Sequence, residues 1–297
     1  MTVKLPVTLK SPYCHQIHCP LGTVTHAVSE FAGPNGPPKV TLMSEQLKAD
    51  SLVQARSENI DRYKRNFAGQ VVCELRFPTL LELGKDRPPA SFIKALRKQY
   101  PTLDSANEFK FALGSTTAEA AHSHVLRSVR GNWAVTLKES TIALETRTYP
   151  GYKAFRERMV TVIDAAAEII DSEFFTRIGM RFINNIENDE DPAQGWINPA
   201  LVEPIRSGAF LGIVEYAGRV QLAAADGGVL LQHGVKLVDS GSGNLKPTYS
   251  FDIDCYRNET AIGEAYDAMD AIHAQAFDVF DWCLDTKARE FLSSEKG

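Results

Sequence analysis

Two arginines recur four residues apart in the segment EFFTRIGMRFINNIE (173–187), whose alternating apolar residues indicate a β-strand. Side chains alternate between the two faces of an extended chain, so Arg177 and Arg181 point to the same side. Guanidinium groups stay charged and bind carboxylates and phosphates. The pair therefore predicts either a charged binding surface or a sheet face on which the arginines pair with carboxylates.

Neighbouring strands are expected to bring further charges to this side. The segments 70–78 and 132–149 also alternate apolar and polar residues, and the second of them has a tight turn in its middle. We expect the strand 173–187 to border 70–78, which in turn borders this hairpin. The shared face would then carry seven charged residues: Arg76, Arg147, Arg177, Arg181, Lys138, Glu74 and Glu145. Two carboxylates can neutralise two cations, which leaves three of the five cations to attract an anion or an acidic helix.

Three interpretations of this face stay open. It is a salt-bridged face covered by the acidic second half of the chain, it binds a separate acidic protein partner or RNA, or it carries a catalytic site. Sheets that bind RNA usually present aromatic side chains on which bases stack, and only Phe175 and Tyr149 could serve here. Nucleic acid is therefore the less favoured ligand.

Two aspartates in the segment DIDCY form a second candidate site. Asp252 and Asp254 share one strand face at a separation of roughly 7 Å, so they could hold a divalent cation or act as an acid–base pair. A solvated strand face explains the same spacing without any chemistry. His122 and His124 would also share a face, and neither pair has a third ligand nearby in the sequence.

A cysteine- and histidine-rich stretch, YCHQIHCP, suggests zinc near the N-terminus. Its four candidate ligands are Cys14, His15, His18 and Cys19. Adjacent side chains point apart, so a single tetrahedral site using all four would strain the backbone, and at most two could contribute. The alternative is a loose, reduced tail, and we predict no cofactor.

Composition places the chain among ordinary soluble globular proteins. It has 297 residues, of which 44% are hydrophobic and 23% charged. The chain contains no apolar run long enough for a membrane span, and its first residues lack the apolar core of a secretory signal. Five cysteines suit reduced thiols better than a disulfide framework. We therefore expect a cytoplasmic protein that does not contact a membrane.

Charge is divided unevenly along the chain. The net charge is −5, but residues 1–181 carry +6 and residues 182–297 carry −11. Such asymmetry indicates a basic surface that recruits an anion, two halves that attract each other, or two solvated surfaces. A homo-oligomer, in which the acidic half of one copy meets the basic face of another, is one consequence.

The elements that would position these residues predict an α+β fold. Residues 1–68 read as an N-terminal extension, because the segment AGPNGPPK interrupts any helix or central strand. Residues 69–187 follow the order β-α-β-β-α-β, which is that of a ferredoxin-like split β-α-β antiparallel sheet. Residues 188–297 read as a second β-β-β-α half, which ends in one long helix over about 262–292.

Several segments together resemble a known family. They are VVCELRFP, WAVTLKESTIALETRTYPGYKAFRERM, FFTRIGMRFINNIE, LLQHGV, YSFDIDCYR and FDVFDWCLDTKAREFL. In this order they resemble a sporadically distributed prokaryotic family of roughly 250-residue proteins of unassigned function. The resemblance covers about residues 68–292 and implies a prokaryotic cytoplasmic protein, with the scattered occurrence of defence or toxin–antitoxin modules.

The expected function is non-catalytic binding. The sequence has no glycine-rich phosphate loop, no serine nucleophile elbow and no dinucleotide fingerprint, which disfavours common enzyme classes without excluding catalysis. We predict an adaptor of a defence-type or toxin–antitoxin-type module that binds a protein partner through the charged face. The alternatives are a divalent-metal-dependent enzyme using Asp252 and Asp254, and an RNA-binding protein.

Overall fold

The computed structural model describes residues 47–60, 62–110, 119–187, 190–239 and 245–295. All described residues belong to one compact unit, which lies within residues 44–297. The stretch that contains Cys14, His15, His18 and Cys19 lies outside the described residues.

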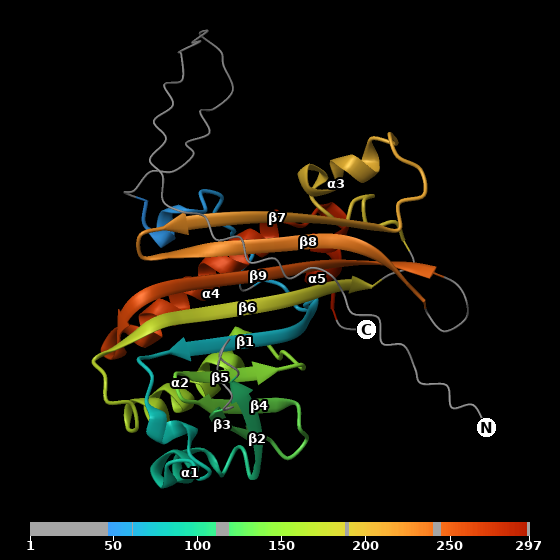
Figure 1. Ribbon diagram of the computed structural model, residues 1–297. Helices are drawn as coiled ribbons and strands as arrows, with labels where there is room; N and C mark the ends of the chain where they lie inside the picture. Colours follow the sequence, from blue (N-terminus) through green and yellow to red (C-terminus); the bar gives the residue numbers. More distant parts are fainter. Residues whose placement is uncertain (1–46, 61, 111–118, 188–189, 240–244, 296–297) are drawn as a thin grey trace, which may run out of the picture. The chain divides into compact units, whose positions relative to one another are not determined.

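The described residues form an α+β fold built on one large antiparallel sheet (Figure 1). Its strands in chain order are β1 (Ala68–Arg76), β2 (Thr102–Lys110), β3 (Glu119–Arg127), β4 (Trp133–Lys138), β5 (Thr141–Thr146), β6 (Phe174–Glu187), β7 (Glu215–Ala224), β8 (Gly227–Asp239) and β9 (Leu245–Ala261). Across the sheet they follow the order β2-β3-β4-β5-β1-β6-β9-β8-β7.

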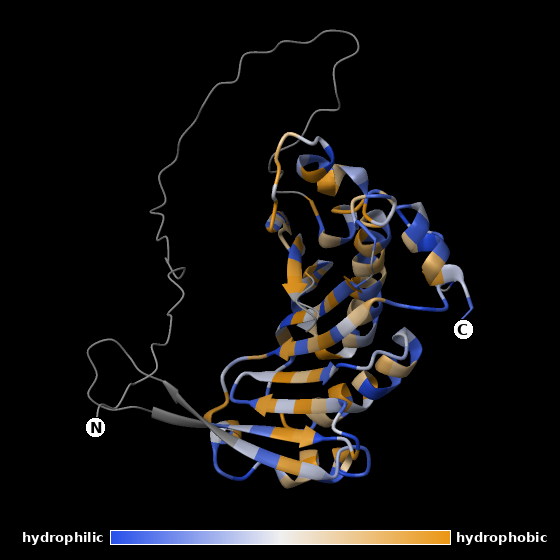
Figure 2. Cartoon of the chain, turned by 90° about the vertical axis from the view of Figure 1, so that its right-hand side faces the viewer, coloured by the Kyte–Doolittle hydropathy of each residue, from blue (hydrophilic) through white to orange (hydrophobic). Residues whose placement is uncertain are grey.

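Helices cover one face of this sheet. They are α1 (Ala90–Leu96), α2 (Tyr152–Ala167), α3 (Pro199–Arg206), α4 (Ala265–Trp282) and α5 (Thr286–Ser293), joined by the short 3₁₀ turns η1 (Ala49–Ser51), η2 (Leu81–Gly84) and η3 (Ile262–Glu264). The long helix α4 packs on β6 and β9, and α2 packs on β5 (Figures 1 and 2). The opposite face of the middle strands has no described helix on it.

Strand alternation sets where the core lies. In β1, Val71, Cys73 and Leu75 are fully buried toward the helices, while Glu74 and Arg76 point to the other face. The apolar stripe of α2, which includes Phe155, meets this buried row. Burying an apolar side chain of this size stabilises the fold by roughly 1.5–3 kcal/mol, so the period-2 pattern specifies which face is covered.

The predicted order of elements over residues 69–187 lacks two strands, β2 and β3. β2 and β3 stand between α1 and the β4–β5 hairpin, where no strands were expected. Their sequences, TLDSANEFK and EAAHSHVLR, contain mostly small or polar residues, as suits strands at the sheet margin, and so show little hydrophobic alternation. Within the large sheet, the four strands β4-β5-β1-β6 do lie side by side in the order expected for them.

The second half does not form a separate layer. β9 pairs with β6 from Phe174 opposite Ala261 to Glu187 opposite Thr248, so β7, β8 and β9 extend the same sheet. Both edges of β6 are therefore satisfied, by β1 and by β9. The continuous terminal helix is also interrupted: α4 ends at Trp282, and Asp285, in an extended conformation, accepts a hydrogen bond from the amide of Thr286 to begin α5.

Residues 47–60 and 62–67, which the sequence suggested were part of an extension, pack against α4 and α5. Arg56 donates to Asp278 at 2.7 Å, and the backbone amide of Ser57 donates to the same carboxylate at 2.8 Å. Further along, the amide of Lys64 donates to the carbonyl of Leu292 at 2.8 Å. This segment, which we call the strap, forms one wall of the site described below.

Candidate functional site

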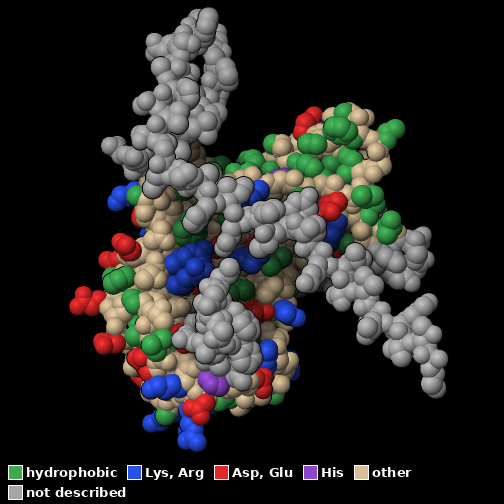
Figure 3. Space-filling view, in the orientation of Figure 1, with side chains coloured by type: hydrophobic (Ala, Val, Ile, Leu, Met, Phe, Trp, Pro, Cys, Tyr) green, Lys and Arg blue, Asp and Glu red, His purple; other side chains and the backbone are tan. Residues whose placement is uncertain are grey.

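Arg177 and Arg181 share one face of the sheet with Arg76, as the sequence predicts. Arg76 in β1 is opposite Arg177 in β6, and Asp254 in β9 is opposite Arg181. We call this surface, on the side without described helices, the open face. Lysine and arginine side chains gather over the middle of it (Figure 3).

Carboxylates from β9 neutralise the two central arginines. Arg181 donates to Asp252 at 2.7 Å, and this hydrogen bond raises the pKa of the guanidinium. Arg177 donates to Asp254 at 2.7 Å, reaches Glu74 at 3.5 Å, and places its guanidinium 4.5 Å from the ring centre of Tyr256. The prediction of three unpaired cations is therefore wrong, because it did not include the strand that supplies the acids.

The outer cations of the open face are also close to carboxylates. Arg76 donates to Glu74 at 2.6 Å, while Arg147 lies 3.6 Å from Glu145. Lys138 lies at the end of β4, opposite Thr141 in register. The open face is thus a network of alternating charges, which corresponds to the salt-bridged interpretation of the sequence.

Asp252 and Asp254 do share a strand face, as predicted, but each of them is engaged by an arginine. Within the described part of the chain, no three His, Cys, Asp or Glu residues form a cluster suited to a metal ion. A carboxylate that already accepts charge-assisted hydrogen bonds is a poorer ligand for a cation. The arrangement therefore does not favour the metal-dependent alternative.

The remaining sequence candidates are structural or lie elsewhere. His124 is fully buried and bonds to the Ser105 hydroxyl at 3.1 Å and to the Lys85 carbonyl at 2.8 Å. Its neighbour His122 lies beside it, with the ring centres 6.5 Å apart. Phe175 is buried in the core and Tyr149 lines a cavity among the helices, so neither offers a stacking platform on the open face.

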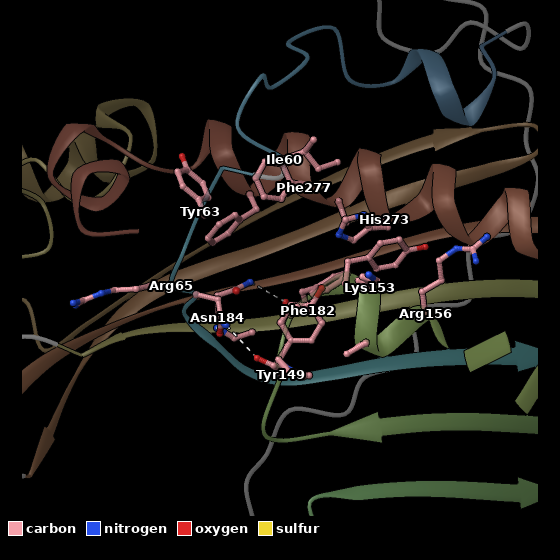
Figure 4. Close-up of a pocket in the computed structure, with 18 of the residues that line it drawn as sticks. Ile60, Tyr63, Arg65, Tyr149, Lys153, Arg156, Phe182, Asn184, His273 and Phe277 are labelled. Carbon is pink, nitrogen blue, oxygen red and sulfur yellow. Dashed lines mark hydrogen bonds between the residues drawn. The ribbon is translucent and has the colours of Figure 1, made fainter. Parts of the chain in front are cut away.

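The cavity that Tyr149 lines is a concave site built from four separate segments of the chain. It has a volume of about 750 Å³ and lies between the strap, the first turn of α2, the middle of α4 and β6 (Figure 4). Its walls are largely aromatic: Tyr63, Tyr149, Tyr152, Phe182, Phe277 and Phe280. Cavities that hold small molecules in proteins have this size range and this lining.

A polar network supports one wall of the cavity. The rings of Tyr152 and His273 are stacked, with centres 3.5 Å apart and planes 4° apart. Tyr152 donates to Asp270 at 2.5 Å, and Arg156 binds both oxygens of that carboxylate at 2.7 and 2.8 Å. The bond to Arg156 lowers the pKa of Asp270, whereas burial raises the pKa of the Tyr152 hydroxyl. The network fixes the stacked pair in place.

His273 contributes to this wall a ring whose nitrogens can be reached from the cavity. It is 8% exposed, and its ring nitrogens have no hydrogen-bond partner among the described residues. Burial lowers its pKa to about 4, so the ring is neutral at pH 7 and offers one donor and one acceptor. Asn184, which is 5% exposed, lines the same space and donates only to the Phe182 carbonyl at 3.5 Å.

Positive charge surrounds the cavity. Lys64, Arg65, Lys153 and Arg156 line it, against the single acid Glu157. Lys153 has no carboxylate partner among the described residues, whereas Arg156 is held by Asp270. The cavity therefore joins aromatic surface, a neutral histidine and one available cation, Lys153, in one place.

Comparison with known protein families, curated proteins and solved structures gave no match. The family resemblance drawn from the sequence therefore stays a prediction. Among the described residues, no helix is both long enough and apolar enough to cross a membrane.

The cavity was not predicted from the sequence. Its residues come from the strap, from 149–157, from 182–184 and from 273–280, which are far apart along the chain. One local indication did exist: His273 interrupts the apolar stripe of α4, where a histidine without a partner is costly to bury. A second was the helix start at Gly151, which lacks a side chain able to cap it.

The ion-pair network of the open face should contribute measurably to stability at its centre. Arg177 is 19% exposed and serves two carboxylates, so Arg177→Met should lower the free energy of unfolding by roughly 1–3 kcal/mol. Arg147 is 79% exposed, and Arg147→Met should change the free energy of unfolding by less than about 0.5 kcal/mol. Urea denaturation measures both, and equal losses would contradict the assigned pairing.

Burial of neutral His273 should make stability depend on pH. Unfolded histidine takes up a proton near pH 6.5 but folded His273 only near 4, so the free energy of unfolding should fall as the pH drops through this window. Across this window the free energy of unfolding should fall by about 3 kcal/mol. His273→Phe keeps the stacking on Tyr152 and should show a weaker pH dependence in urea titrations between these values. Parallel curves for the two proteins would refute the assignment.

Proposed function

We propose that the protein is a binding protein that holds a small molecule in the cavity between the strap, α2, α4 and β6. The observation that supports this best is His273, which is nine-tenths buried, lacks a hydrogen-bond partner among the described residues and faces a cavity of about 750 Å³ (Figure 4). Its ring nitrogens remain accessible from the cavity, so a ligand can bond to them in place of water.

Binding fits the cavity better than proton-transfer chemistry does. A histidine with a pKa of about 4 is a weak general base at neutral pH. The carboxylate of Asp270 is held by Arg156 and Tyr152, which stabilise its charged form. The groups around the cavity are thus arranged to recognise a ligand through stacking and hydrogen bonds.

Filling the cavity should abolish binding without unfolding the protein. Ala276 lines the cavity and is buried, so Ala276→Phe would occupy ligand space, and Ala154→Phe would do the same from α2. Ala167→Phe, at the exposed end of α2, is the matched control. Saturation-transfer NMR with a library of small aromatic compounds should detect binders for the wild type and the control, and none for a folded cavity variant.

Thermal melting identifies which cavity variant is folded and can be interpreted. The proposal fails if the wild type binds nothing in the library, or if a folded cavity variant keeps the same binders as the control.

A second candidate function is the binding of a protein partner on the open face. In its favour, Arg147 and Arg181 are 79% and 49% exposed on a side of the sheet that no described helix covers. An exposed network of both charge signs can select a partner of complementary pattern. Such a partner would belong to the defence-type module that the sequence resemblance implies.

Charge reversal tests this second candidate. A partner that co-purifies in stoichiometric amount from the native cell should be lost with the double variant Arg147→Glu/Arg181→Glu, because both changes place like charges beside carboxylates and reverse the pattern. The control variant Lys94→Glu changes an exposed residue of α1 and should retain the partner. Retention by the double variant would exclude the open face as the contact surface.

A further inference from the structure

We infer that the ligand of the cavity is an aromatic compound that carries a phosphate group, of about the size of a nucleoside monophosphate. This inference rests on the proposed small-molecule binding and names the chemistry that the cavity selects. Four features of the site support it: the start of α2, the charges beside it, the aromatic walls and the volume.

The first turn of α2 opens into the cavity. Gly151 precedes the helix with φ +112° and has no side chain to cap it, and Gly151, Tyr152, Lys153 and Ala154 all line the cavity. The first amides of a helix have no intrahelical acceptor, and the helix dipole places partial positive charge at this end. In a 16-residue helix this end suits an anion such as phosphate.

Side chains independent of the helix point to the same ligand. His273 is nine-tenths buried and directs an unpartnered ring into the cavity, where its N–H can donate to an anionic oxygen. Lys153 and His273 lie around the same space in Figure 4. Lys153 has no carboxylate partner among the described residues, so its charge is available to a ligand.

The charge of the lining favours phosphate over carboxylate. Helix amides, the Lys153 ammonium and the His273 ring are all donors, and a carboxylate offers them two oxygens and a single negative charge. A phosphate monoester presents three oxygens and close to two negative charges at neutral pH. It therefore matches the donor set and the positive charge of the lining more fully.

The rest of the cavity is built for a planar ring. The ring centre of Phe182 lies 6.1 Å from that of His273 and 5.9 Å from that of Tyr149. The ring centre of Phe277 lies 6.5 Å from that of His273, and all three ring pairs are tilted rather than stacked. Tilted rings leave aromatic faces and edges exposed to the cavity, on which a flat ligand can rest. The volume of about 750 Å³ far exceeds that of inorganic phosphate alone.

Paired ligands with and without phosphate test the inference. Isothermal titration at neutral pH would compare AMP with adenosine and phenyl phosphate with phenol, in about 50 and about 300 mM NaCl. At least one phosphate should bind about tenfold or more tightly than its neutral counterpart, and added salt should weaken it. Equal affinity of both pairs, or no binding of either phosphate at about 1 mM, overturns the inference.

The variant Lys153→Glu tests whether the charge of Lys153 contributes to binding of the phosphate. A glutamate in the first turn suits the helix dipole, so folding should not suffer, and thermal melting checks this. Affinity for the phosphate ligand should fall about tenfold or more in Lys153→Glu, while Lys94→Glu, a matched reversal on α1 away from the cavity, should stay within about twofold of the wild type. Unchanged affinity in Lys153→Glu overturns the inference.

The cavity-filling variants distinguish failure of the phosphate assignment from failure of the proposed small-molecule binding. If adenosine and AMP bind equally and both are lost in folded Ala276→Phe, small-molecule binding stands and only the phosphate assignment fails. If folded Ala276→Phe and Ala154→Phe both bind AMP as the wild type does, the ligand lies elsewhere and the proposed function fails with it.

Discussion

The fold depends on the pairing of β6 along both of its edges. β1 satisfies the backbone groups on one side, and β9 those on the other side along the whole strand. Because backbone donors and acceptors in a sheet interior must be paired, this arrangement joins strands from both ends of the described chain into one sheet. The same strand then serves two surfaces: Arg177 and Arg181 point to the open face, while Phe182 and Asn184 line the cavity.

The two surfaces satisfy polar groups in opposite ways. On the open face water is present and every central charge has a carboxylate or guanidinium within hydrogen-bond reach, so little attraction is left for a further ion. In the cavity, His273 has no hydrogen-bond partner among the described residues, and its ring nitrogens remain accessible. A group that still lacks a protein partner can contribute more to ligand binding than an exposed charge that is already paired.

Elements with strong periodicity could be predicted from the sequence, and those without it could not. β1, the β4–β5 hairpin, α2 and β6 were found because their apolar residues recur at a period of 2 or 3.6. β2 and β3 lack that pattern, and the break between α4 and α5 depends on the short capping interaction of Asp285. Asp252 and Asp254 were interpreted as a possible cation site, an acid–base pair or a solvated strand face, because nothing local revealed that β9 would lie beside the arginines of β6.

The sequence by itself determined which side chains share a face within each strand or helix, because that depends only on local backbone geometry. It therefore placed Arg177 with Arg181 and Asp252 with Asp254 correctly. Only the tertiary structure decided which faces meet, since strand order and register depend on contacts between residues far apart in the chain. That is why the arginines acquired acidic partners from β9, and why four distant segments enclose the cavity around His273.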